Sequence, residues 1–334
     1  MAAVASSDIA IADRASPIPE SRVIRLPVFR GLGPVELAQS VETASEAGFN
    51  GILVPLTVGG LPIFPSPAPR RFGLKACIPE FRRRDVLGEV CDAARKAGVR
   101  LYASVQPWRP GSEVPGATIL RWFCRRLDWF AQGPQALRRR SPRIKAKDLS
   151  FCPSNPMRRR YVGDLLSEAV EGYPVAGLSF ETASLPHSLE PGRERCFCSY
   201  CREEAREKAG LALADLTQKP PPQEALEAWE ALQIESIHSA IGYYSQRGHK
   251  SRAGLVLHCR TMATKERGEE EPPGPDGQAR LAMRLWREGL QMGAIDGLAV
   301  EGFPQEAEAL AGVLERNLAS WPDDALLYPV LSAS

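Results

Sequence analysis

The chain has no long hydrophobic run. No segment reaches the roughly 18 consecutive apolar residues that a membrane-spanning helix needs. The first 21 residues contain Asp8, Asp13 and Arg14, and they lack the basic start and apolar centre of a secretory signal. We therefore expect a disordered lead-in over residues 1–21, a cytoplasmic address and no membrane partner.

Charge of one sign is not in excess either. The 42 Lys and Arg residues nearly balance the 40 Asp and Glu residues, so no overall field favours a nucleic-acid partner. The exception is the segment from Arg121 to Arg160, which has twelve basic residues and two Asp. This segment is either a solvated surface or a rim that attracts an anionic polymer such as an acidic polysaccharide. Nucleic acid is not expected, because no binding motif accompanies the charge.

Two signatures of cofactor and metal enzymes are also missing. The chain has only four histidines, none of them paired at metal-ligand spacing, which argues against a metal-dependent hydrolase. The glycine turn after the first expected strand reads FRGLGP, which is not a dinucleotide-binding motif. We therefore expect no cofactor to be required for catalysis.

The chain does show a regular alternation of apolar strands and amphipathic helices. Strands are expected at 23–29, 49–56, 99–107, 175–181, 252–259, 295–303 and 325–331, and helices between them at 35–48, 84–98, 154–173, 200–209, 222–246, 278–293 and 305–319. Parallel strands joined by helices indicate an α/β fold. Long loops and polar residues follow the strands, which favours a (β/α)8-type TIM barrel in a single domain, 22–334, over an open doubly wound sheet. Seven strands are evident; the eighth is either absent or lies unrecognised within 183–250.

Two expected strands deliver a glutamate where they end. VAGLSFE ends in Glu181, and IDGLAVEG carries Glu301 near its end. Active sites of (β/α) barrels lie at the carboxyl ends of the strands, and two carboxylates are what glycoside hydrolysis needs. We predict Glu181 as the general acid and Glu301 as the nucleophile or the base that activates water. The alternative is that each glutamate forms an ion pair at the barrel mouth.

Four more residues near strand ends are candidates for contacting a substrate. Gln106 and Trp108 follow the third expected strand, and His258 and Arg260 end the fifth. An indole at a cleft can stack on a pyranose ring, but Trp108 can equally anchor its own loop. His258 either binds a sugar hydroxyl or is a structural residue.

Three of the eight cysteines are clustered in the segment CFCSYC. Cys196, Cys198 and Cys201, with His187 upstream, match the ligand set of a closed tetrahedral zinc site. Cys152 is the other candidate for the fourth ligand, and free or redox-active thiols are the alternative to zinc. With a full ligand set the ion would be structural, because no position is open for chemistry.

Three stretches resemble the family-10-like glycosyl hydrolases, which are hypothetical glycosyl-hydrolase-like TIM-barrel proteins of bacteria. AGFNGILVPLTVGGLPIFPS (47–66) looks like the region of their second strand. FCPSNPMRRRYVGDLLSEAVEGYPVAGLSFETASLP (151–186) is similar to the region of their fourth strand, and CFCSYC (196–201) resembles a cysteine cluster of some members. The resemblance covers roughly residues 22–303 and implies a barrel that acts on carbohydrate.

The chain departs from that family pattern at two positions. Ala176 stands where the family has an Asp before Gly, and Thr182 stands where it has a second acidic residue. The main hypothesis is a glycoside hydrolase that cleaves a polysaccharide or oligosaccharide. The departures favour the alternative, a non-catalytic carbohydrate-binding barrel. No pattern in the sequence specifies the oligomeric state.

Overall fold

The structure is a computed structural model of the whole chain. It describes residues 22–26, 28, 33–75, 78–110, 114–133, 144, 149–180, 196–211, 222–251, 257–262, 297–301 and 326–329. In the last three ranges only the backbone is described. The expected lead-in, 1–21, lies outside these ranges, as do the last two expected helices. Among the described helices, none is both long and apolar enough to cross a membrane.

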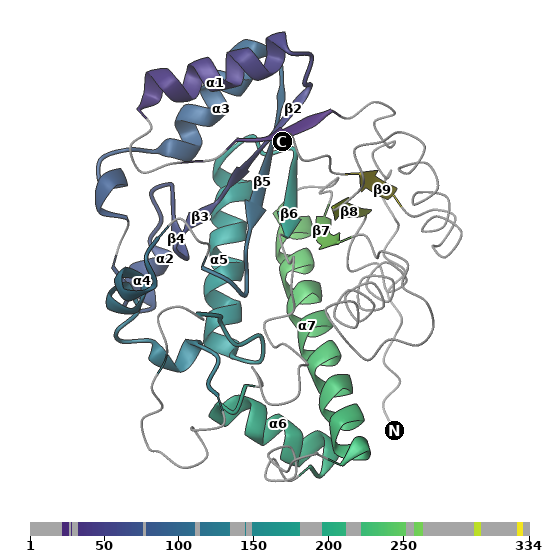
Figure 1. Cartoon of the computed structure of the whole chain (residues 1–334). Helices are drawn as coiled ribbons and strands as arrows, with labels where there is room; N and C mark the ends of the chain where they lie inside the picture. Colours follow the sequence, from purple (N-terminus) through teal and green to yellow (C-terminus); the bar gives the residue numbers. More distant parts are fainter. Residues whose placement is uncertain are drawn as a thin grey trace, which may run out of the picture.

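The main element is a seven-stranded sheet in which every neighbouring pair is parallel. Its strands are β1 (Val23–Arg25), β2 (Gly51–Pro55), β5 (Arg100–Val105), β6 (Gly177–Phe180), β7 (Leu257–Met262), β8 (Gly297–Glu301) and β9 (Leu326–Pro329). Their order in space is their order in the chain (Figure 1). This confirms the seven parallel strands, and a doubly wound sheet would instead reverse its order at a switch point. No pairing of β1 with β9 occurs among the described residues, so barrel closure and an eighth strand remain predictions.

Helices connect the strands as expected. They are α1 (Pro34–Glu46), α3 (Val86–Ala97), α5 (Pro156–Gly172), α6 (Ser199–Ala209) and α7 (Gln223–Ser251), with the short α2 (Ala68–Arg71), α4 (Gly116–Trp122), η1 (Pro79–Phe81) and η2 (Leu127–Trp129) in the loops after β2 and β5. The start of α5 differs by two residues from the prediction. Asn155 caps it, since the Asn155 side chain accepts from the Arg158 backbone N–H at 2.9 Å. The Ser154 hydroxyl bonds that of Ser236.

A hairpin lies in the Pro- and Gly-rich segment that follows β2, where the sequence predicted no strand. It consists of β3 (Thr57–Val58) and β4 (Leu61–Pro62), joined by Gly59 and Gly60. Both glycines have positive φ, 60° and 81°, as a two-residue turn of this hand requires. A Cβ on Gly59 would lie 2.6 Å from the Trp122 ring, so the hairpin also packs too closely on α4 for any larger residue.

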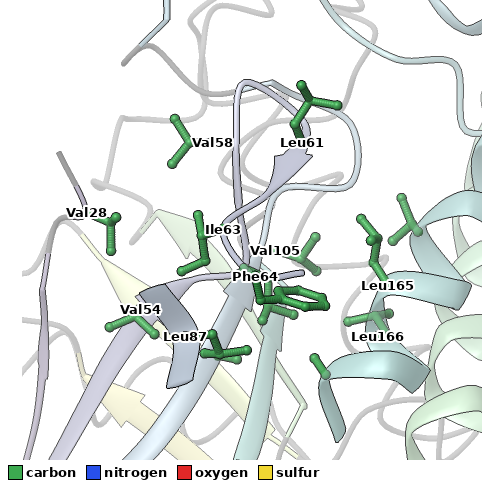
Figure 2. Packing of buried hydrophobic residues seen from close by; sticks show 14 of the residues in the cluster. Val28, Val54, Val58, Leu61, Ile63, Phe64, Leu87, Val105, Leu165 and Leu166 are labelled. Carbon is green, nitrogen blue, oxygen red and sulfur yellow. The ribbon is translucent and has the colours of Figure 1, made fainter. Parts of the chain in front are cut away.

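One face of the sheet packs against the helices. Val54 and Val105 lie on this face, and Figure 2 shows them with Leu87 of α3 and with Leu165 and Leu166 of α5, all in the main core. Side chains alternate between the two faces along a strand. The neighbours of Val54 and Val105 in β2 and β5, such as Leu53 and Ser104, therefore belong to the opposite face. That opposite face carries the candidate site.

Candidate functional site

The strand register brings the candidate positions onto one face of the sheet. Ser104 of β5 is level with Ser179 of β6, which is level with His258 of β7. Two residues further along β7 is Arg260, level with Ala299 of β8. Glu301, the last residue of β8, is two residues beyond Ala299. Alternation with a period of two therefore assigns all of these register positions to the same face.

The opposite face is identified by Phe180, the last residue of β6. Its ring stacks on Tyr244 of α7, with centroids 5.7 Å apart, and it belongs to the main core. Phe180 is level with Cys259 and, through it, with Leu298. Glu301 is three residues beyond Leu298, so its register position belongs to the face that does not pack against α7.

The two residues expected after the third strand have different environments. Gln106 is half-buried directly after β5. Trp108 is only 2% exposed, and its ring lies against Tyr244 with centroids 6.2 Å apart. Its backbone carbonyl accepts from the Phe151 N–H at 2.6 Å. This burial favours the interpretation of Trp108 as an anchor for its loop over that of a sugar-stacking surface.

The remaining predicted residues are placed only in part. Glu181 and His187 lie outside the described residues; Glu181 is the residue after Phe180. His258 and Arg260 are the second and fourth of the six residues of β7, so they do not end that strand as expected, and Glu301 is the last residue of β8. Their pairing as catalytic or binding groups therefore remains a prediction.

Two buried serines belong to this face and were not singled out from the sequence. Ser104 and Ser179 are 1% and 3% exposed, and the Ser104 hydroxyl has no hydrogen-bond partner among the described residues. Each serine precedes a candidate, Gln106 or Glu181, by two residues. A polar residue at every second position of an otherwise apolar strand was the signal that could have revealed them.

A buried arginine lies beside the same strand ends. Arg158, in the first turn of α5, is fully buried, and its Nη2 donates to the Pro107 carbonyl at 3.4 Å. Its guanidinium carbon lies 3.8 Å from the centre of the Phe151 ring. No acidic partner is recorded for it within the described ranges, and its Nε and Nη1 have no hydrogen bond there. Burial lowers the pKa of Arg158 to about 10.

The described structure also gathers four cysteines. Cys196 and Cys198 precede α6, Cys201 lies in its first turn, and Cys152 comes from the segment before α5. Their Sγ atoms all lie within 4.8 Å of one another, and all four residues are buried. The Cys152 Sγ is 3.5 Å from that of Cys198 and 3.4 Å from that of Cys201. The predicted trio is therefore brought together with Cys152.

Contacts with neighbouring sulfurs shift the pKa values of Cys152, Cys198 and Cys201. Hydrogen bonds from its three cysteine neighbours hold the pKa of Cys198 well below its ordinary value. Hydrogen bonds to neighbouring sulfurs, together with burial, raise the pKa of Cys152 and of Cys201. Such a group can hold one thiolate by internal hydrogen bonding, but four thiolates need a cation among them.

Comparison with known proteins gives structures but no sequence family. No protein-family description matches the chain, and no curated protein matches it. The family-10-like resemblance therefore stays an expectation.

Several solved glycosidase structures have a similar fold. The catalytic domain of a β-amylase from Paenibacillus polymyxa matches with a TM-score of 0.59 at 10% identity, covering 93% of this chain and 92% of that one. The PgaB (BpsB) glycoside hydrolase domain from Bordetella bronchiseptica matches with 0.51 at 12% identity over 94% of both chains. A β-galactosidase from Halorubrum lacusprofundi matches with 0.51 at 12% identity over 86% of this chain but only 42% of its own. The chain thus shares the fold of these domains.

Proposed function

We propose that the chain is a glycoside hydrolase that cleaves a polysaccharide or oligosaccharide with Glu181 and Glu301. The observation that carries the proposal is the strand register. It assigns Ser179, His258, Arg260 and Glu301 to one face of three adjacent parallel strands, and Glu301 is at the carboxyl end of β8. That end of a parallel barrel is where active sites are built. The similarity in fold to glycosidase domains supports the same class of reaction.

The spacing of the strands suits two cooperating carboxylates. Glu301 ends β8, Glu181 follows β6, and only β7 lies between these two strands. Neighbouring strands are about 4.8 Å apart, so the two strand axes are separated by roughly 10 Å. Along the strands, Glu301 is three residues beyond the level of Phe180, the residue before Glu181. Side chains that converge from this distance can bring their carboxyl groups within the roughly 5–9.5 Å that spans retaining and inverting glycosidases.

Each group has a defined role in the proposed reaction. Glu181 protonates the leaving glycosidic oxygen, and Glu301 either attacks the anomeric carbon or removes a proton from the attacking water. Gln106, His258 and Arg260 bind sugar hydroxyls around the scissile bond. No cofactor takes part in these steps.

The test is hydrolysis of a panel that contains starch, a β-galactoside and a β-N-acetylhexosaminide, by the wild-type chain and by two variants. We expect Glu181→Gln and Glu301→Gln each to lower kcat by about 10²–10⁴-fold with little change in stability. Glu42→Gln, an exposed position on α1, is the matched control and should retain full activity. Retention of activity in either active-site variant would overturn that residue's role.

The second candidate function is carbohydrate binding without catalysis, and the departures at Ala176 and Thr182 favour it. Affinity electrophoresis in polysaccharide gels distinguishes the two. Retarded migration of the wild type together with no product from any member of the panel would establish the binding function.

A further inference from the structure

We propose that Cys152, Cys196, Cys198 and Cys201 bind one zinc ion, and that this ion fastens α6 to the segment between η2 and α5. The site does not depend on the proposed hydrolase function, and it is tested without a substrate. On binding, the four thiols release their protons to solvent as four Zn–S bonds form.

The positions of the sulfur atoms fit a tetrahedral ion. With Zn–S bonds of about 2.3 Å, the sulfurs of a tetrahedral site lie about 3.8 Å apart. Here all four Sγ atoms lie within 4.8 Å of one another, and the two contacts of Cys152 are 3.4 and 3.5 Å. A small outward movement of the sulfurs would admit the ion at their centre.

Disulfides explain this arrangement less well. The four cysteines are free, and the Cys152 Sγ is almost equidistant from those of Cys198 and Cys201. A disulfide needs one partner at about 2.05 Å, whereas Cys152 has two sulfur neighbours at 3.5 and 3.4 Å. A tetrathiolate ion uses all four residues equivalently.

The surroundings of the cysteines show why an ion is needed. The small core around them, here called the cysteine core, consists of Cys152, Cys196, Phe197, Cys198, Cys201, Ala205, Ala225 and Trp229. Half of its members are cysteines, and none is an aliphatic residue larger than alanine. Helix α6 buries only Cys201 and Ala205. So little apolar area gives a weak attachment, and small cores of this kind are commonly held by a metal.

The backbone also prepares the site. The Cys152 N–H donates to the Trp129 carbonyl at 2.8 Å, and the Phe197 N–H donates to the Gln132 carbonyl at 2.7 Å. These bonds fix both cysteine-bearing segments against the same stretch, η2 and the residues after it. Four buried thiolates leave no open coordination position, so the zinc is structural.

Elemental analysis of the purified full-length chain tests the proposal. We expect one zinc per chain, and a fall of about tenfold or more in Cys152→Ser and in Cys201→Ser. Cys124→Ser is the matched control, because Cys124 is exposed and lies outside the cluster. His187→Ala should keep its zinc, since the four cysteines complete the site.

A second measurement does not depend on variants that fold. Replacing zinc by cobalt(II) in the wild-type chain should give the visible spectrum and sulfur-to-metal charge transfer of a tetrahedral four-thiolate site. Full zinc content in Cys152→Ser would overturn the ligand set. Iron in place of zinc, a mass lower by two hydrogens per disulfide, or metal-free protein whose four thiols react freely would each overturn the zinc site.

Discussion

The two hydrophobic cores of this protein are built in different ways. The main core runs from β1 to α7 and consists largely of aliphatic side chains, some of which Figure 2 shows, and of aromatic rings in contact with one another. The cysteine core has one Phe, one Trp, two Ala and four Cys. The first can be stabilised by apolar burial alone. The second has too little apolar surface for that, so its stability should depend on a bound ion.

The largest expected difference concerns the two tryptophans, one in each core. Trp129 contacts the rings of Phe72, Phe123 and Tyr161, whereas within the described residues Trp229 stacks on one ring, that of Phe197. We expect Trp129→Ala to lower the free energy of unfolding by about 3–5 kcal/mol. Trp229→Ala should cost about half as much in the metal-loaded protein, because the ion still holds the segment. Urea unfolding with and without a chelator measures both.

The proposed difference between the two cores is wrong if the chelator increases the loss of unfolding free energy in Trp129→Ala and leaves the loss in Trp229→Ala unchanged. Native-state hydrogen exchange gives a local control. After chelation the α6 amides should lose protection, while those of α3 and α5 keep theirs.

The next effect compares how helices begin in the two regions. Asp85 caps α3, since its Oδ1 accepts from the Gly88 N–H at 2.9 Å and its Oδ2 accepts from the Tyr173 hydroxyl at 2.9 Å. Cys198 caps α6 without a side-chain hydrogen bond to the helix. We expect Asp85→Ala to cost about 1–2 kcal/mol in thermal unfolding. Cys198→Asp supplies a good cap but removes a metal ligand. Better protected α6 amides in this variant would show that capping, and not the ion, limits α6.

Ser104 is expected to show a smaller effect of opposite sign. Its hydroxyl is buried without a partner among the described residues. Ser104→Ala should therefore raise the free energy of unfolding by about 1 kcal/mol, and it should weaken carbohydrate binding if the hydroxyl contributes to the site. Thermal unfolding and affinity electrophoresis report the two effects. Val105→Ala, on the helix-facing side, is the contrast and should be destabilising. A loss of stability in Ser104→Ala would mean that the hydroxyl is already bonded.

The smallest net effect is expected at Arg158, the charge buried in the aromatic part of the main core. Arg158→Met should change the free energy of unfolding by no more than about 1 kcal/mol, because relief of desolvation offsets the lost ring contacts and the Pro107 bond. A loss of about 3–5 kcal/mol would show instead that the guanidinium neutralises an anion.

The pH dependence of the Arg158 effect has a definite sign. The pKa of Arg158 falls from its ordinary value to about 10 in the folded chain, so between these two values the unfolded chain binds more protons. The destabilisation caused by burying the charged guanidinium is therefore complete below pH 10, and it decreases as the pH rises above 10. The wild type should gain stability relative to Arg158→Met above pH 10, as followed by urea unfolding at a series of pH values.

Much of the fold could be predicted from local patterns. Six strands of the sheet lie within the expected apolar runs, because a buried parallel strand needs continuous apolar residues. The seventh, β7, shares only residues 257–259 with its expected run and continues to Met262. The hairpin at Gly59–Gly60 was missed, since its strands of two residues are too short to show a periodicity. The start of α5 was predicted two residues too early, at 154, because Ser154 is also a good capping residue.

The sites were less predictable than the fold. CFCSYC suggested a metal from its spacing, but Cys152 is remote in the chain, and only the approach of α6 to the segment before α5 selects it. The carboxylate pair remains a prediction. What the structure adds is the register, which assigns Glu301, Arg260, His258 and the two buried serines to a common face.

The order of residues along this chain determined where strands and helices form, since hydrophobic periodicity, prolines and glycines act within a few residues. Tertiary structure decided which distant groups meet: four sulfurs around one point, a guanidinium among rings, and polar positions level across neighbouring strands. Those contacts depend on packing and strand register, which bring together residues that no local pattern links.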